Sequence, residues 1–476
     1  MNKLRSFQAI SVFLFFIFRT NAQQNSYDPL KYYTPDELKE DFNYFRGTLE
    51  KYHPNLYLYS SRQTVDSSFD YLYQSIDTAM TDLHFYRYIS RMIPVIKDGH
   101  NMILPGKESV NYYNKNAGFL PYTLYSIGDK LYCAQNSTAE IAIKNGTEIT
   151  SINGIPAKQL IEELLNRQLR DGYNETYPRW IINNYFRGYY SFIYGHPELF
   201  TITYKENNYE KKYTGKALTL DSIRYYRQKY PFANGSYNVN KGISLIINKE
   251  ATTAVVTIRS FDNGTFKKEY KQSYAKEIRS YFKTIRRNNI QHLIIDIRGN
   301  QGGNPVYVRK LLARLFMARF TVALQAGKVK KPQAAAWTER NKKKYFPRYA
   351  IGSFHPNKNA FTGKLYVLID GGTYSAAGQF ASVIDKYHRA VFIGEETGGN
   401  KAIIGGFFFP RKNILPHTRI EISPARLYTF YRQPASNNGH GVYPDHIVAP
   451  TITDIIERRD PAMEFSWRLI NAPAKK

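Results

Sequence analysis

The sequence of 476 residues contains a single cysteine, Cys133. One cysteine excludes a disulfide within the chain, and it excludes zinc sites and iron–sulfur clusters built from several cysteines. Acidic residues are also scarce, because 39 Asp and Glu stand against 66 Lys and Arg, which gives a formal charge of +27. Such a charge favours contact with acidic peptides or anionic surfaces and carries no information about the fold.

Long apolar runs are absent as well. No segment after the N-terminus is apolar over the roughly 20 residues that a membrane helix needs. The one apolar stretch near the start, residues 9–18, follows Lys3 and Arg5 and precedes the small residues of Thr20-Asn21-Ala22. This order is typical of a secretory signal peptide. We therefore expect residues 1–22 to be cleaved and the mature chain to be exported, to the periplasm or the medium if the host is bacterial.

The rest of the composition is that of a globular protein, with 43% hydrophobic and 22% charged residues. The first segment, 23–108, is predicted to be helical. Thr34-Pro35-Asp36-Glu37 is typical of a capped helix start. The residues Leu38, Phe42, Phe45 and Leu49 then recur at helical spacing, which predicts one buried stripe.

The middle segment, 109–215, changes to short strands, predicted at 131–134, 141–143 and 148–152. Asn153-Gly154 predicts a hairpin turn. A helix is predicted over 157–166, and residues 205–216 are expected to form a linker or an exposed hairpin.

The remainder, 216–476, alternates strands and helices and predicts an α/β fold with βαβ units. Strands are expected at 254–258, 292–297, 365–369 and 390–394. Helices are expected near 267–287, 305–319 and 375–387, and a final strand over 419–428.

Two strand-to-helix turns carry the candidate catalytic residues. The first, residues 296–304, is rich in glycine, and the second, residues 370–378, places Ser375 where a helix begins. Amide groups at such turns stabilise a developing negative charge, so the N–H of Ala376 is a candidate beside a serine nucleophile. The alternative is that Ser375 simply caps the helix. The second turn lacks the Gly-x-Ser-x-Gly pattern of the α/β-hydrolases.

A serine nucleophile needs a base, and two candidates stay open. His100, in Asp98-Gly99-His100, offers a neutral imidazole near pH 7. Lys401 offers an amine that acts as a base when it is desolvated. Each has a plain structural alternative, a buried structural histidine or a solvated lysine.

The motifs occur in a characteristic order. Asp-Gly-His stands at 98–100, Asp-x-Arg-Gly-Asn-x-Gly-Gly at 296–303, Thr-x-Ser-Ala-Ala at 373–377, Gly-Glu-x-Thr-Gly-Gly at 394–399 and Gly-Val-x-Pro-Asp at 441–445. In this order they resemble the tail-specific, or C-terminal-processing, serine peptidases and the tricorn protease core. The run at 146–154 is similar to one found in PDZ domains. The resemblance covers nearly the whole mature chain.

The resemblance implies a role for each matching position. Ser375 falls on the nucleophile, and Ala376 with Gly302 or Gly303 falls near the oxyanion positions. The lysine of a Ser-Lys pair would fall at 400, an Asn, so Lys401 stands one place late. The tricorn-like branch implies His100 as base, and its orienting glutamate falls on Asn438. Asp445 or another carboxylate is a possible substitute for that glutamate.

The resemblance implies a crotonase-like α/β core over 216–476 and a PDZ-like peptide-binding module over 109–215. The expected function is that of an exported serine endopeptidase acting on peptides or unfolded tails, with no metal and no other cofactor. The alternative is a catalytically impaired relative that binds peptide or a small apolar ligand. The basic stretch at 328–348 is either solvated surface or a positive rim for acidic peptides. No nucleic-acid-binding motif accompanies the charge.

Overall fold

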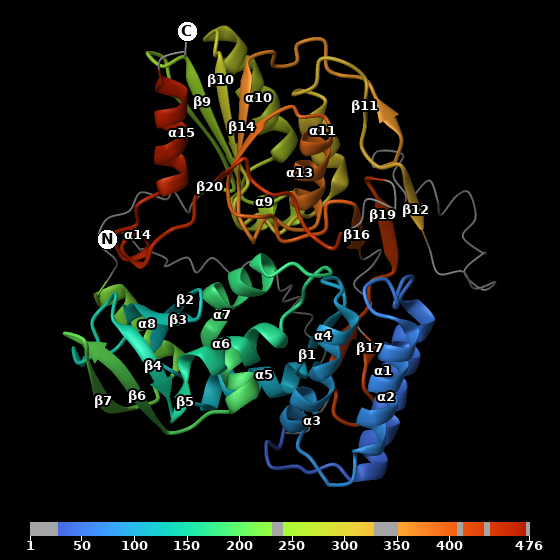
Figure 1. Cartoon of the computed structure of the whole chain (residues 1–476), viewed down its shortest axis with the longest axis vertical. Coiled ribbons are helices and arrows are strands. Elements are labelled where there is room, and N and C mark those ends of the chain that lie inside the picture. The colour runs from blue at the N-terminus through green and yellow to red at the C-terminus, as the bar shows by residue number, and fades with distance from the viewer. Residues whose placement is uncertain (1–26, 231–240, 328–350, 407–412, 433–437, 473–476) are drawn as a thin grey trace.

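The computed structural model describes residues 27–230, 241–327, 351–406, 413–432 and 438–472. The signal peptide expected at 1–22 and the basic stretch at 328–348 lie outside these residues and stay predictions. Figure 1 shows two halves, one built around a twisted sheet with helices on both sides and the other made of the N-terminal helices and a second sheet.

The N-terminal region is helical, as predicted. Helix α1 (Pro35–Tyr52) begins with a capping box, since the Thr34 hydroxyl accepts from the N–H of Glu37 and the Glu37 carboxylate accepts from the N–H of Thr34. The apolar stripe predicted on α1 is buried, as expected. The region continues with α2 (Arg62–Gln74), α3 (Asp82–Ile89), the 3-10 turn η1 (Ser90–Met92), α4 (Ile93–Ile96), β1 (Met102–Leu104) and α5 (Lys107–Asn116).

The middle segment forms an antiparallel sheet. Its order is β2 (Tyr122–Ile127), β3 (Lys130–Asn136), β4 (Glu148–Ile152), β6 (Leu199–Glu206) and β7 (Tyr209–Lys216), and β5 (Ile155–Pro156) also pairs with β4. The hairpin turn is confirmed, because Asn153 and Gly154 both have positive φ, 51° and 80°. Residues 205–216 belong to the β6–β7 hairpin. The helices of this segment and the link that follows it are α6 (Ala157–Asn166), α7 (Thr176–Tyr194) and α8 (Leu220–Lys229).

One strand prediction in this segment is wrong. Residues 141–143 are a loop, because the Asn136 amide donates to the carbonyls of Glu140 and Ile143, at 2.7 and 2.9 Å. These side-chain hydrogen bonds take the place of a strand ladder.

The helical region and the middle sheet share one hydrophobic core. That core runs from Tyr33 through Phe42 and Leu131 to Tyr204, and it includes Leu415 and Ile422 from near the C-terminus. The two regions separated by the sequence prediction are therefore packed together, and a late segment of the chain completes their core.

The second half is a six-stranded sheet with the order β20-β15-β14-β10-β9-β8. All pairs are parallel except β8 with β9. The strands are β8 (Ile243–Asn248), β9 (Thr253–Ile258), β10 (His292–Asp296), β14 (Lys364–Ile369), β15 (Val391–Gly394) and β20 (His446–Ile447). Four of them confirm the predicted strands to within one residue at each end.

Helices cover both faces of this sheet. One face packs under α10 (Tyr274–Arg287), α11 (Pro305–Leu312) and α13 (Ala376–Lys386), and the other packs under α15 (Pro461–Asn471). The shorter helices here are α9 (Asn263–Lys268) and α14 (Ile452–Glu457). The sequence-based expectation of an α/β protein is confirmed as a mixed α/β fold with several sheets.

The predicted strand over 419–428 is two strands, because Pro424 has no N–H and interrupts the ladder. β18 (Glu421–Ser423) joins β1 and β17 (Asn413–Ile414), whereas β19 (Leu427–Phe430) joins β12 (Gln325–Gly327) and β16 (Ile403–Gly406). A further pair is β11 (Phe320–Thr321) with β13 (Ser353–Phe354).

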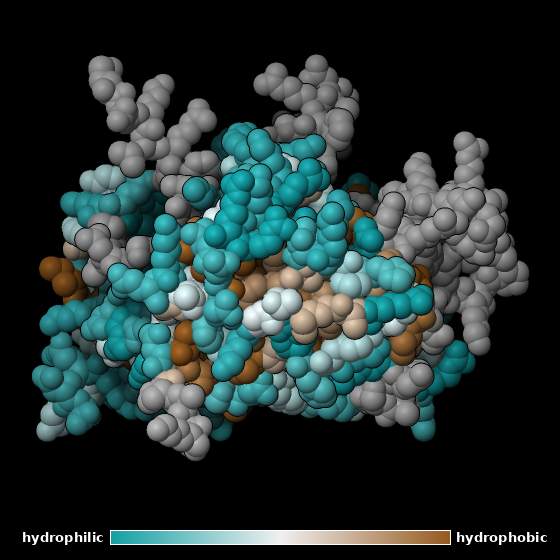
Figure 2. All heavy atoms as spheres, turned by 90° about the horizontal axis from the view of Figure 1, so that it is seen from above, coloured by the Kyte–Doolittle hydropathy of each residue, from teal (hydrophilic) through white to brown (hydrophobic). Residues whose placement is uncertain are grey.

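The surface is largely polar. Figure 2, which views the molecule from above Figure 1, shows hydrophilic residues over most of that face, with apolar atoms in patches near its middle. Within the described ranges, no helix combines the length and the apolar character needed to cross a bilayer.

Candidate active site

The two glycine-rich turns meet because they follow neighbouring parallel strands, β10 and β14. The N–H of Tyr374 donates to the carbonyl of Asn300 at 3.0 Å. The Thr373 hydroxyl donates to the carbonyl of Ile297 at 3.1 Å. These bonds place Ser375, at the end of the second turn, directly beside the first turn.

Ser375 has an unusual backbone for a residue that is not glycine, with φ 52° and ψ −119°. Such a conformation costs of the order of 1–3 kcal/mol and persists only where the surroundings impose it. The side chain makes no capping hydrogen bond to α13. Its Oγ lies 3.1 Å from Nε2 of His100 instead. The helix-cap interpretation of this serine is therefore wrong.

His100 reaches Ser375 from the other half of the molecule. Helix α4 ends at Lys97 in a left-handed conformation, and the Asp98 carboxylate then accepts from the N–H of His100 at 2.6 Å. The imidazole is buried. Burial lowers its pKa to about 4, against the opposing effect of nearby Asp98. A neutral imidazole is thus available at pH 7 to accept a proton from the serine.

The other imidazole nitrogen also has a partner. Nδ1 of His100 lies 2.8 Å from the hydroxyl of Tyr374, and the two rings stack with centroids 4.9 Å apart. Asp171, buried in the loop between α6 and α7, lies near that hydroxyl, since a Cβ added to Gly99 would overlap the hydroxyl and lie 2.9 Å from Oδ1 of Asp171.

Sequence reasoning missed both of these residues. Tyr374 stands at the unspecified position of the Thr-x-Ser motif, and Asp171 belongs to no motif. The only available signal was the phenol directly preceding the serine.

The residue expected to orient the imidazole lies elsewhere. Asn438 is exposed, and its Oδ1 accepts from the N–H of His440 at 3.2 Å. Asp445, the suggested substitute, accepts from the N–H of Phe392 at 2.7 Å. The Tyr374 hydroxyl, and neither of these side chains, occupies the position beside Nδ1.

Lys401, the alternative base, also lies apart from the serine. Its Nζ sits over the ring of Tyr443, 5.9 Å from the centroid, and its N–H donates to the carbonyl of His440. Of the two candidate bases, the structure brings His100 to Ser375.

The three predicted oxyanion donors differ in whether their N–H groups are free to bind an oxyanion. The N–H of Gly302 already donates to Oδ1 of Asn300 at 2.9 Å, so that N–H is not available for an oxyanion, and this prediction is not supported. Gly302 matters sterically instead, because a Cβ there would lie 2.6 Å from the nitrogen of Ala376. For the N–H groups of Ala376 and Gly303, no acceptor is found among the described residues. These two remain the candidates.

One group in the described part of the chain has metal-ligand character, Asp98 with His100 and Asp171, whose ligand atoms lie within 4.8 Å of one another. The Asp171 oxygens already accept from the N–H groups of Gly99 and Asn400, at 2.8 and 3.2 Å. Both ring nitrogens of His100 also have partners. Most of these atoms are engaged, so a cation fits this cluster poorly.

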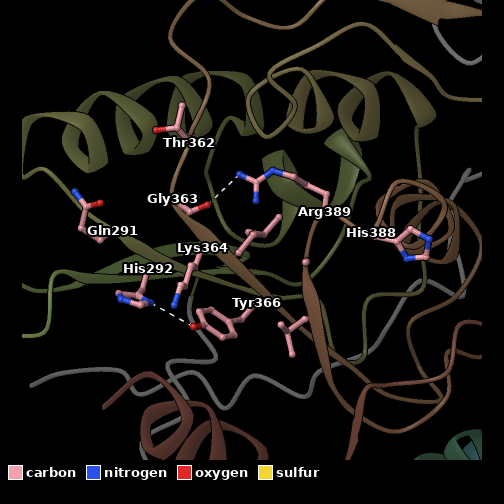
Figure 3. A pocket seen from close by; sticks show the side chains of 11 residues that line it. Gln291, His292, Thr362, Gly363, Lys364, Tyr366, His388 and Arg389 are labelled. Carbon is pink, nitrogen blue, oxygen red and sulfur yellow. Dashed lines mark hydrogen bonds between the residues drawn. The ribbon is translucent and has the colours of Figure 1, made fainter. Parts of the chain in front are cut away.

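A cavity of about 580 Å³ lies at the opposite, amino-terminal end of the parallel strands, lined by the residues where β10, β14 and β15 begin. Figure 3 shows His292, Lys364, Tyr366 and Arg389 around it, with the His292–Tyr366 contact dashed. The Arg389 guanidinium donates to the carbonyls of Leu315, Phe361 and Gly363. The serine and the histidine are at the carboxyl ends of the strands, so this cavity is separate from them.

Comparison with known proteins agrees with this geometry. Residues 252–448 match the family model of Peptidase family S41. No curated protein matches the sequence.

Solved structures resemble the chain more broadly. Mature CPAF matches with a TM-score of 0.64 at 15% identity, covering 93% of this chain and 99% of that one. Mature CPAF complexed with lactacystin matches with a TM-score of 0.63 at 15% identity, over 92% and 99%. The photosystem II D1 C-terminal processing protease gives 0.45 at 14%, over 92% and 98%. The likeness to CPAF shows a shared fold over almost the full length.

The matched residues include both turns and Ser375, and they end just after Asp445. Residues 252–448 are therefore similar to peptidase family S41, and the chain is a serine-type peptidase.

Proposed function

We propose that this chain is an exported serine endopeptidase that hydrolyses peptide bonds in peptides or unfolded protein tails through an acyl-enzyme on Ser375. The observation that carries the proposal is the 3.1 Å contact between Ser375 Oγ and Nε2 of a buried imidazole with a lowered pKa. Export rests on the N-terminal sequence pattern alone.

The chemistry follows from these groups. Nε2 of His100 removes the hydroxyl proton while Oγ attacks the carbonyl carbon of the peptide bond. The N–H groups of Ala376 and Gly303 stabilise the tetrahedral oxyanion. The C–N bond then breaks as the imidazolium returns its proton to the leaving amine, and water hydrolyses the ester by the same path.

The domain organisation belongs to the same proposal. Residues 216–476 form a crotonase-like catalytic core, and residues 109–215 form a PDZ-like module that binds an extended peptide by strand addition. The motif at 146–154 supports the second part, since it forms β4 with the turns on either side. A net positive chain also suits acidic peptides and anionic surfaces.

The test is hydrolysis of an unfolded protein by the full chain and by Ser375→Ala. The variant should lose turnover and keep its fold by circular dichroism. Undiminished turnover would reject the mechanism.

Peptide capture is tested in the same Ser375→Ala chain, because the middle sheet shares its core with the N-terminal helices. Free-C-terminal peptides should bind more tightly than their amides. Binding of both without any hydrolysis by the unmodified chain would favour the alternative, a catalytically impaired binding protein.

A further inference from the structure

The hydroxyl of Tyr374 lies between two groups that compete for its single proton. On one side is Nδ1 of His100, at 2.8 Å. On the other is the buried carboxylate of Asp171, whose pKa the contact with Tyr374 lowers, and which in turn helps to raise the pKa of Tyr374. The direction in which this hydroxyl donates decides which nitrogen of His100 carries the proton.

Both flanking groups are held firmly. The ring of Tyr374 is clamped between His100 and Tyr177, whose ring lies parallel at 4.0 Å. The Asp171 oxygens accept from the N–H groups of Gly99 and Asn400. These bonds join the loop before α7 to the segment that carries His100 and to the loop after β15.

Hydrogen-bond accounting then fixes the tautomer. When Asp171 is ionised it only accepts, so in its contact with Asp171 the Tyr374 hydroxyl is the donor and turns its lone pairs toward Nδ1. Nδ1 must therefore carry a proton, which leaves Nε2 of a neutral imidazole bare and facing Ser375 Oγ. In the opposite arrangement the hydroxyl donates to Nδ1, Nε2 carries the proton, and the imidazole is unable to take the serine proton.

We propose that Asp171 and Tyr374 are positioning residues that set the imidazole of His100 in the tautomer with a proton on Nδ1. This inference rests on the proposed function, because it gives the pair a task in activating Ser375. The pair takes the place of the carboxylate that would otherwise contact the imidazole directly.

The neighbouring carboxylate does not fill this role. Asp98 Oδ1 accepts from the backbone N–H of His100, and its Oδ2 lies 3.1 Å from Nε2 of His53. Its contacts orient the loop and not the ring.

Protonation of Asp171 would reverse the relay, because the carboxyl would then no longer require the Tyr374 proton. Burial and the charge of Asp98 raise the pKa of Asp171 above its ordinary value. The titratable groups that face Asp171 are Asp98, Tyr59, Tyr177 and Tyr374. The proposal therefore includes a loss of activity when Asp171 gains a proton.

The test compares the full chain with Tyr374→Phe and Asp171→Asn. Each should lower kcat by roughly 10² to 10⁴, with little change in KM, since a base in the wrong tautomer is not productive. Tyr86→Phe, at a buried phenol in the core of the N-terminal half, is the matched control for the phenol, and Asp445→Asn is the control for the carboxylate. Both controls should keep kcat. If Asp171→Asn fails to fold, Tyr374→Phe carries the test.

Nitrogen-15 NMR of labelled histidine reads the tautomer directly, with the His100 signals assigned by their loss in His100→Ala. Above about pH 8, where a carboxyl with a pKa of about 7 is ionised, the unmodified chain should show Nδ1 protonated and Nε2 bare, and both variants should shift toward the opposite tautomer. An Nε2-protonated imidazole in the unmodified chain, or normal kcat in Tyr374→Phe, would overturn the inference.

The two proposals fail separately. An Nδ1-protonated imidazole that depends on Tyr374 and Asp171, in a chain that hydrolyses nothing, would overturn the proposed function and support the inference. Hydrolysis that survives unchanged in both variants would overturn the inference and support the function.

Discussion

The two halves of the molecule contribute to the site in different ways. The half with the six-stranded sheet supplies Ser375 and Tyr374 from one turn. The glycines and the helix start of that turn make its catalytic role readable from the local sequence. The N-terminal half supplies His100 and Asp171 from two loops that are 71 residues apart and joined through Gly99. The reactive contact thus exists only where the halves meet, and changes at that junction should affect catalysis as strongly as changes in the motif.

The largest loss of activity is expected when the imidazole of His100 is removed. His100→Ala should lower kcat by roughly 10⁴, the scale for loss of a catalytic base. Lys401→Ala is the matched control and should retain most of the activity, because the lysine lies over Tyr443. Steady-state kinetics on an unfolded substrate measures both. A dead Lys401→Ala with a nearly normal His100→Ala would instead establish a Ser-Lys pair.

Crowding the junction at Gly99 tests the contribution of the N-terminal half without removing a functional group. In Gly99→Ala the new Cβ would overlap the Tyr374 hydroxyl and lie 2.9 Å from Oδ1 of Asp171. The displaced imidazole should cost roughly 10² in kcat. Gly47→Ala, at an open position on α1, is the control and should stabilise the fold by about 1 kcal/mol. Full activity in a folded Gly99→Ala would argue against a close-fitted junction.

The pH profile shows whether protonation of Asp171 or of His100 limits the activity. A base must be unprotonated, so activity is full above the governing pKa and falls about tenfold per pH unit below it. The sequence alone predicts this fall at pH 6–7, but burial lowers the pKa of His100 to about 4. The raised pKa of Asp171 should therefore place the fall well above pH 4. In Asp171→Asn the fall should move toward pH 4, and an identical profile for both chains would contradict this.

The smallest effect is expected at the position that family resemblance favours. Asn438→Ala removes an exposed side chain bonded to the backbone of His440. Its stability should change by no more than about 0.5 kcal/mol, as for most surface substitutions. Its kcat should stay close to that of the unmodified chain. A large fall in kcat would show that Asn438 reaches the imidazole during the reaction.

Local signals account for what the sequence predicted. Buried strands such as β9 and β14, the α1 capping box and the Asn153-Gly154 turn depend on neighbouring residues, and each was correct. The loop at 141–143 and the break at Pro424 depend on which partners pair, and there the predictions were wrong. Asp171 was not predictable, because its role comes from contacts with loops far along the chain.

The central claim is that Ser375 is an activated nucleophile, and covalent labelling tests it most directly. A fluorophosphonate should label the pure full-length chain once, and peptide mass spectrometry should place the adduct on Ser375. Labelling should vanish in Ser375→Ala and become far slower in His100→Ala. An unlabelled chain, or an adduct that persists in Ser375→Ala, would contradict the account.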